Sequence, residues 1–180
     1  YNEGVDNLGI IGFYKKVMLP TFAKIGLFWL TNRINPGQEH FLSELFKQKI
    51  MSSIDCEEMS HKKAKTWLLF LPPNEYHEIG LLFSKFLLQK HGFNVIYLGA
   101  NVPLNCVSEI TKKKKIDNIL YFSISNLSKN DLQKTVQRLN TDCKKIPQKI
   151  VTNYEDITIL DKNTQIINNL DSFISILNKG

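Results

Sequence analysis

Cysteine pairs, secretory signals and long apolar runs are all missing from this sequence. Its 180 residues include three cysteines, Cys56, Cys106 and Cys143, which are too far apart, and odd in number, for a disulfide framework or a Cys-x-x-Cys metal site. The longest apolar runs, such as 67–71, fall well short of the roughly 20 residues that a membrane-spanning helix needs. The N-terminus has no basic patch followed by an apolar segment. These absences favour a cytoplasmic protein that does not cross a membrane.

Acidic residues are fewer than basic ones, and the formal net charge is +6. The lysines are spread along the chain except for the runs at 62–65 and 112–115. The second run follows a predicted helix, where cations interact favourably with the helix dipole. A solvated surface is the simpler interpretation and a phosphate-binding patch the alternative. No sequence motif that reads DNA is present.

Residues 1–58 are predicted to form a bundle of helices. In 13–31 the apolar residues recur at three- and four-residue steps, as in an amphipathic helix, and Pro20 is predicted to bend it. The segment 35–37 (NPG) ends this helix and opens a second one, predicted over 38–53. Its inward side is predicted to carry Leu42, Leu45, Phe46, Lys49 and Ile50. Two or three helices cannot close a core comfortably, so the domain is expected to begin upstream of this sequence.

The second half, 66–180, alternates between strand-like and helical segments. Buried strands of a parallel sheet are predicted at 67–71, 95–98, 119–122 and 149–152, with a weaker one at 165–167. Helices are predicted at 78–90, 104–114, 129–140 and 170–178. Strands separated by helices require crossover connections, so the fold class is a helical bundle followed by a doubly wound, Rossmann- or flavodoxin-like parallel-sheet domain. The polar residues 57–65 are predicted to be a linker.

The loop after the first predicted strand lies where doubly wound sheets bind their ligands, beyond the carboxyl ends of the strands. It contains Glu75, His77 and Gly80 in the pattern Glu-x-His-x-x-Gly. A neutral imidazole is a good ligand for a metal such as cobalt, and a carboxylate nearby can accept the other ring N–H. A glycine in the first helical turn lets a bulky planar ligand approach the backbone. We therefore predict His77 as a metal ligand; a half-exposed loop histidine is the simpler alternative.

This pattern resembles the Asp/Glu-x-His-x-x-Gly signature of domains that bind cobalamin with its own base displaced by a histidine. The resemblance implies that His77 is the lower axial ligand of the cobalt in adenosylcobalamin or methylcobalamin. Ser123 and Ser125 follow the third strand, where that family has Ser-x-Leu. The resemblance implies that Ser123 lines the pocket of the displaced nucleotide tail, while Ser125 replaces the leucine. A serine that caps nearby backbone is the alternative for Ser123.

A second pattern lies in the helical half, where nine residues separate Trp29 from Glu39-His40. It resembles the Trp-x9-Glu-His motif of light-responsive MerR-type transcription regulators of the CarH/LitR kind. The resemblance implies that the bundle covers the upper face of adenosylcobalamin and that light cleaves the cobalt–carbon bond. Loss of that bond would disrupt a homo-oligomer, a dimer or tetramer, that binds DNA through a domain outside this chain. No enzymatic activity is expected.

The helical pattern is compatible with these roles. Glu39 falls on the inward side of its helix, where an unpaired carboxylate would be costly and a ribose hydroxyl would satisfy it. A structural salt bridge or a charge at the helix N-terminus is the alternative. His40 lies nearer to the rim and is expected at a subunit contact. Trp29 shares a stripe with apolar residues, so a core tryptophan is its alternative.

Two positions depart from the cobalamin-binding pattern. After the fourth strand the family carries Gly-Gly, whereas this sequence has Thr152-Asn153, whose side chains narrow the expected tail pocket. Leu30 stands where the light-responsive regulators have a histidine that takes the upper cobalt position after photolysis. Two other functions therefore stay open: a corrinoid methyl carrier that serves separate methyltransferases, and a regulator module that has lost cofactor binding.

Overall fold

The computed structural model of the chain describes all residues except 32, 57–64, 125–126, 155–156, 158–161 and 180, and the side chains of Trp29, Leu30 and Lys179 are also outside the description. The chain divides into two compact units, Tyr1–Lys49 and Ile50–Gly180. The predicted linker lies largely in 57–64, outside the described residues, so the domain boundaries 1–58 and 66–180 stay predictions. No described helix is long and apolar enough to cross a membrane.

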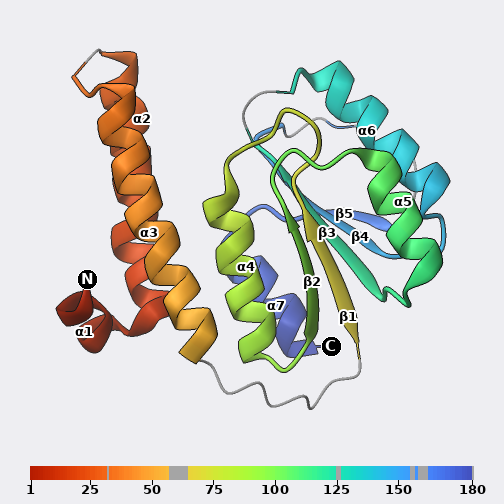
Figure 1. Cartoon of the computed structure of the whole chain (residues 1–180), viewed down its shortest axis with the longest axis horizontal. Helices are drawn as coiled ribbons and strands as arrows, with labels where there is room; N and C mark the ends of the chain where they lie inside the picture. The colour runs from red at the N-terminus through yellow and green to blue at the C-terminus, as the bar shows by residue number, and fades with distance from the viewer. Residues whose placement is uncertain (32, 57–64, 125–126, 155–156, 158–161, 180) are drawn as a thin grey trace. The chain divides into compact units, whose positions relative to one another are not determined.

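The first unit is helical (Figure 1). It contains α1 (Asn2–Phe13), a π-helical segment (Tyr14–Met18), α2 (Leu19–Leu30) and the start of α3 (Pro36–Cys56). The irregularity predicted at Pro20 takes the form of this wider π-helical segment immediately before it, because proline lacks an N–H and excludes the carbonyl four residues back. Pro36 is the first residue of α3, as predicted.

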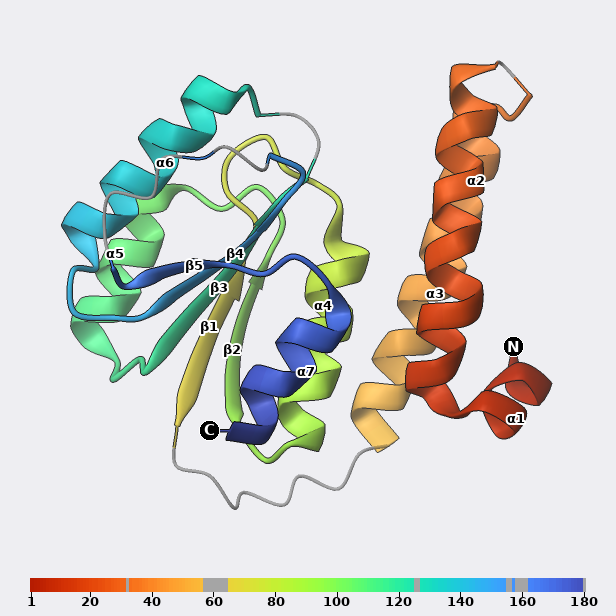
Figure 2. The same cartoon turned by 180° about the vertical axis from the view of Figure 1, so that it is seen from behind.

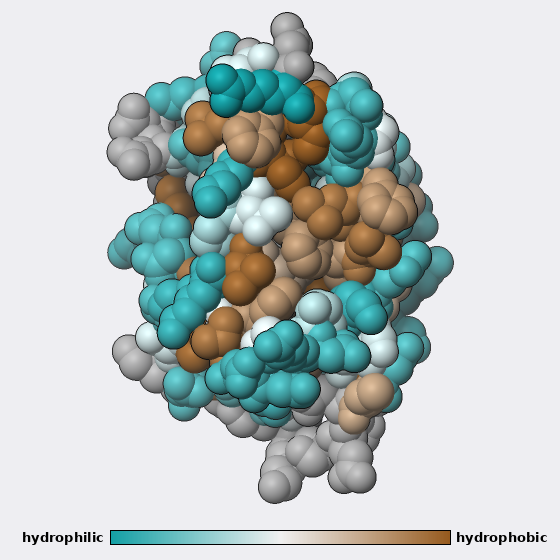
Figure 3. Space-filling model, turned by 90° about the vertical axis from the view of Figure 1, so that its left-hand side faces the viewer, coloured by the Kyte–Doolittle hydropathy of each residue, from teal (hydrophilic) through white to brown (hydrophobic). Residues whose placement is uncertain are grey.

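The helices of this unit leave apolar side chains exposed. Figure 3 shows apolar side chains gathered on the face of the molecule that it draws. Leu27 and Phe41 are 62% and 68% exposed. Leu45 is 38% exposed and Lys49 is also exposed, so their predicted inward positions are wrong, whereas Ile50 is buried as predicted. A lysine in such a stripe keeps its ammonium group in water. The exposed apolar surface agrees with the expectation that these helices alone do not close a core.

The second unit is built on a five-stranded, fully parallel sheet in the order β2-β1-β3-β4-β5. Its strands are β1 (Thr66–Phe70), β2 (Asn94–Gly99), β3 (Asn118–Ser123), β4 (Gln148–Thr152) and β5 (Thr164–Ile166). Each contains most of the apolar run from which it was predicted. The chain moves outward from β1 in both directions, so the topological switch point lies between β1 and β3.

Helices cover both faces of this sheet (Figures 1 and 2). They are α4 (Glu78–Lys90), α5 (Leu104–Lys113), α6 (Lys129–Asp142) and α7 (Leu170–Lys179). In both views α5 and α6 lie on one face, and α4 and α7 lie on the other. Ser128 caps α6 by accepting a hydrogen bond from the Asp131 N–H. The predicted three-layer α/β architecture is confirmed.

The core of the second unit comes from the apolar residues of both sheet faces. Under α5 and α6, Phe70 stacks on Tyr121 with ring centroids 5.5 Å apart. On the other face, Trp67 makes edge contacts with Phe93 and Phe173. The central strands β1 and β3 are buried almost throughout, which holds their carboxyl ends at a fixed spacing. The candidate site is built on those two ends.

Candidate functional site

A tight turn carries the chain from β1 into the predicted ligand loop. The Glu75 N–H donates to the Pro72 carbonyl at 3.1 Å, and Asn74 has a positive φ of 66°. Proline at the second position and asparagine with positive φ at the third are the features of a type II turn. The sequence Pro-Pro-Asn-Glu therefore encodes the turn that places Glu75 inside the protein.

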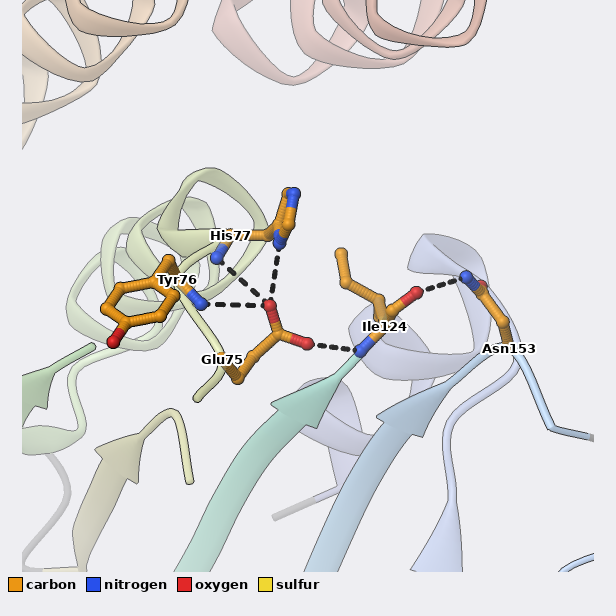
Figure 4. A network of polar contacts seen from close by, with 5 residues as sticks. All are labelled: Glu75, Tyr76, His77, Ile124 and Asn153. Carbon is orange, nitrogen blue, oxygen red and sulfur yellow. Dashed lines mark hydrogen bonds and ion pairs between the residues drawn. The ribbon is translucent and has the colours of Figure 1, made fainter. Parts of the chain in front are cut away.

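Glu75 is fully buried, and its carboxylate accepts hydrogen bonds from two parts of the chain (Figure 4). Oε1 accepts from the N–H groups of Tyr76 and His77 at 3.0 and 3.1 Å and lies 2.7 Å from His77 Nδ1. Oε2 accepts from the Ile124 N–H, just after β3, at 2.8 Å. These contacts suit an ionised carboxylate, which can accept hydrogen bonds on both of its oxygens.

The contact with Glu75 fixes the chemical form of His77. With an ionised Glu75 as the acceptor, Nδ1 is the donor, and a neutral ring in this contact has its lone pair on Nε2. The His77 side chain is 54% exposed, whereas that of Glu75 is 0% exposed. Figure 4 shows the ring directed away from the strands. The pair thus presents a ring with a set tautomer at the carboxyl end of β1, as the sequence predicted.

Gly80 lies in the first turn of α4, close to an aromatic ring. A β-carbon at this position would lie 3.3 Å from Cε1 of Phe122, which is closer than nearly all such contacts. The glycine was predicted to let a planar ligand approach the backbone. In this structure the ring of Phe122, near the end of β3, lies against Gly80. The glycine therefore allows α4 to pack closely on the sheet.

The end of β2 supports the same loop from its other side. Asn101, also in a left-handed conformation, donates its N–H to the Glu75 carbonyl at 3.1 Å, and its side-chain oxygen accepts from the Asn74 N–H at 2.9 Å. Gly99 has a φ of 80°, and a β-carbon there would lie 3.1 Å from Oε1 of Glu78. Sequence reasoning missed Asn101; an asparagine just after a strand end was the available signal.

The predicted serine element is only partly described. Ser123 is the last residue of β3 and is buried, at 2% exposure. Ser125 lies outside the described residues. The backbone of Ile124 between them makes the contact with Glu75, a contact that no side-chain pattern could have revealed.

The Thr152-Asn153 departure places a polar side chain beside this backbone. Asn153 Nδ2 donates to the Ile124 carbonyl at 2.6 Å, and the Tyr154 N–H reaches Thr152 Oγ1 at 3.3 Å. The structure therefore brings Glu75, His77, Ile124 and Asn153 together at the switch point of the sheet (Figure 4). Asn153 was noted in the sequence only as a departure from Gly-Gly.

The other predicted site residues lie in the helical unit. Trp29 and Leu30 end α2, but their side chains are outside the described part of the structure. Glu39 lies in the first turn of α3 and is half-buried, and its Oε1 accepts from Ser43 Oγ at 3.0 Å. His40 is exposed, as its predicted place at the rim requires. The roles predicted for Trp29, Glu39 and His40 stay predictions.

The donor set at the switch point suits a metal centre that needs one protein ligand. Among the described residues, no group of three or more histidine, cysteine, aspartate or glutamate side chains is arranged to hold a metal ion. The buried Glu75 carboxylate and the half-exposed His77 ring instead form the pair of a single imidazole ligand and its supporting acceptor. Such a ligand fits a metal whose other positions are filled by a macrocycle.

One curated protein resembles the chain in sequence. No family model matches the chain. The HTH-type transcriptional repressor CarH of Myxococcus xanthus is 24% identical over 126 residues, which make up 70% of this chain and 42% of that protein. The chain therefore spans well under half the length of this relative. The resemblance to regulators of the CarH kind that the two sequence motifs indicated is confirmed.

Solved structures with the same fold include three that concern corrinoids. A cobalamin-binding protein from Desulfitobacterium hafniense DCB-2 has a TM-score of 0.52 at 16% identity and covers 87% of this chain and 76% of its own. The monomethylamine corrinoid protein of Methanosarcina barkeri has a TM-score of 0.63 at 16% identity, with 88% and 78% covered. A chain of the methanol:cobalamin methyltransferase complex from the same organism has a TM-score of 0.57 at 14% identity. That match covers 98% of this chain and 74% of its own. The predicted fold class is confirmed.

Proposed function

We propose that the chain binds a corrinoid cofactor at the carboxyl ends of β1 and β3, with His77 as the lower axial ligand of its cobalt. The observation that carries this proposal is the pairing of the buried Glu75 carboxylate with His77 Nδ1 at 2.7 Å. The pair lies at the switch point, which is where doubly wound sheets bind ligands. The relative in sequence and the similar solved structures support a corrinoid over another metal macrocycle.

The residues of this loop fit the proposed ligand. A corrin ring supplies the equatorial ligands of its cobalt, so the protein needs to contribute only one axial nitrogen. Glu75 keeps the proton on Nδ1, which leaves the Nε2 lone pair for the metal and raises the basicity of the ring. The bound cofactor would supply the cobalt–carbon chemistry, while the chain's own residues bind and orient it.

We further propose that the chain is the sensory part of a transcription regulator and has no enzymatic activity. The sequence resemblance to the repressor CarH supports this role, together with the Trp29-x9-Glu39-His40 pattern. In this proposal the cofactor is adenosylcobalamin, and its presence or its photolysis sets the oligomeric state and thereby the affinity of a separate domain for DNA. Leu30 has no donor atom, so an upper protein ligand to the cobalt would have to come from His40 or another residue.

Absorption spectroscopy of the purified chain with added adenosylcobalamin in the dark tests this proposal. We expect a spectrum in which histidine replaces the nucleotide base, and a higher melting temperature, because a ligand that binds only the folded state stabilises it. His77→Ala should lose the spectrum, and Glu109→Gln, at an exposed position on α5, should keep it. Illumination should then change the molecular mass of the wild type in light scattering. A wild-type spectrum identical to that of the free cofactor would contradict the proposal.

A corrinoid methyl carrier is the second candidate. It is favoured by the fold, which is shared with the monomethylamine corrinoid protein and a chain of the methanol:cobalamin methyltransferase complex. The two functions differ in what the cobalt exchanges. A methyl carrier passes methyl groups to a partner methyltransferase. The proposed sensor instead changes its oligomeric state, and thus its molecular mass in solution, when the upper ligand is lost. Light scattering before and after illumination, beside a methyl-exchange assay, separates them.

A further inference from the structure

Asn153 extends the contact between β3 and β4 beyond the last backbone pair. The register of the two strands ends at Ser123 opposite Thr152. One residue further on, Asn153 Nδ2 donates to the Ile124 carbonyl at 2.6 Å and continues the pairing with a side chain. The exposed Asn153 side chain thus holds the half-buried Ile124 in place. The next residues, 125–126, lie outside the described part of the chain.

The residue that Asn153 holds is also the one that binds Glu75. The Ile124 N–H donates to Glu75 Oε2 at 2.8 Å, while its carbonyl accepts from Asn153. Ile124 is therefore anchored on both sides (Figure 4). Glu75 is fully buried, so displacing Ile124 would remove one hydrogen bond from a carboxylate in the protein interior, at a cost.

We propose that Asn153 is a positioning residue for the His77 ligand, acting through Ile124 and Glu75. By anchoring Ile124 it keeps the N–H on Oε2, which holds the carboxylate in the rotamer whose Oε1 faces His77 Nδ1 at 2.7 Å. The proposal rests on the proposed function in one respect only, that the ring so positioned is a cobalt ligand. In this proposal, the Asn153 of the Thr152-Asn153 pair helps to orient the His77 ring.

The chain offers a matched control. Asn163 Nδ2 donates to the Lys144 carbonyl at 3.0 Å, an exposed contact of the same chemical type between two loops. Asn163→Ala therefore removes an equivalent bond without touching Ile124 or Glu75. The test variants are Asn153→Ala and Asn153→Asp, the second of which keeps the shape and loses the donor.

Two NMR signals of the cofactor-free protein provide the first test. We expect Asn153→Ala and Asn153→Asp to speed amide hydrogen exchange at Ile124 by about tenfold, because the local opening becomes easier. Both should also broaden or shift the His77 Nδ1–H signal, and Asn163→Ala should leave both signals as in the wild type. An unchanged Nδ1–H signal in Asn153→Ala would overturn the proposal, since Asn153 would then only join two loops.

Cobalamin titration provides the second test. Supporting residues of metal ligands affect affinity by about ten- to hundredfold, so a residue one step further away should weaken hydroxocobalamin binding by roughly three- to tenfold in Asn153→Ala. Asn163→Ala should bind as the wild type does, and equal affinity of Asn153→Ala would overturn the proposal. A wild type that takes up no cobalamin, with the NMR signals responding as expected, would instead refute the proposed function and leave Asn153 as the residue that positions the Glu75–His77 pair.

Discussion

Glu75 Oε2 accepts the backbone N–H of Ile124 at 2.8 Å, although 49 residues separate the two in sequence. This hydrogen bond closes the gap between the ends of β1 and β3, and it does so from the same carboxylate that holds His77. The orientation of the His77 ring and the contact between these two strand ends therefore depend on one buried carboxylate.

Replacing that charge should destabilise the protein. Glu75→Gln keeps one acceptor but turns an NH₂ group toward backbone N–H donors, so buried donors lose their partner. We expect the free energy of unfolding to fall by about 1–3 kcal/mol. Urea denaturation measures the change, and Glu109→Gln, at an exposed position on α5, should stay within about 0.5 kcal/mol of the wild type. A Glu75→Gln protein as stable as this control would show that the hydrogen bonds of the Glu75 carboxylate make no net contribution to the free energy of unfolding.

Gly80 and Phe122 should be energetically coupled. Gly80→Ala gains helix propensity but brings a methyl group to about 3.3 Å from the Phe122 ring. Phe122→Leu removes the ring edge, so the alanine should be less costly in that background by about 0.5–1 kcal/mol. A double-mutant cycle of thermal or urea unfolding gives the coupling. Additive effects would mean that the ring moves aside freely.

The buried lysine of β4 should make stability depend on pH. Burial lowers the pKa of Lys149 from its usual 10.5, and its Nζ contacts Asn118 Oδ1 at 3.3 Å and the Trp67 ring. The unfolded chain thus keeps this proton to a higher pH than the folded protein does. The free energy of unfolding therefore rises as pH increases from the lowered pKa toward 10.5.

Lys149→Met lacks this contribution, and other titrating groups cancel in the comparison. Its stability relative to the wild type should be greatest near neutral pH and should decline as the pH approaches 10.5. Urea unfolding of both proteins at a series of pH values checks this. A difference that stays constant across the alkaline range would contradict the assigned effect of burial.

The predicted upper side of the site can be tested through the upper ligand. If Glu39 binds a ribose hydroxyl, Glu39→Ala should weaken adenosylcobalamin binding by about tenfold or more, the effect of a hydrogen bond to a charged group. Methylcobalamin has no ribose on that face, so its affinity should change less than about twofold. Ser43→Ala removes the internal partner of Glu39 and should leave both affinities near those of the wild type. Equal losses for both cofactors would refute the ribose contact.

The sheet was predictable because its central strands are buried on both faces, and its strands appear in the sequence as apolar runs between helical patterns. Glu75 and His77 were predictable because a carboxylate and an imidazole two residues apart followed such a run. The supporting contacts were not: Ile124 contributes a backbone N–H, and Asn153 acts through a pairing between strands. Leu45 was assigned to the wrong side because three- and four-residue spacing does not separate a residue at the border of an apolar helical stripe from one at its centre.

Electron paramagnetic resonance of the cob(II)alamin-loaded protein tests the central claim most directly, because the unpaired electron couples to the axial nitrogen. With protein labelled by ¹⁵N in histidine only, a chain that ligates through His77 should convert the ¹⁴N triplet into a ¹⁵N doublet. His77→Ala should lose that doublet. A triplet that persists in the labelled wild type would mean that the cofactor keeps its own base, and the assignment of His77 as the ligand would be wrong.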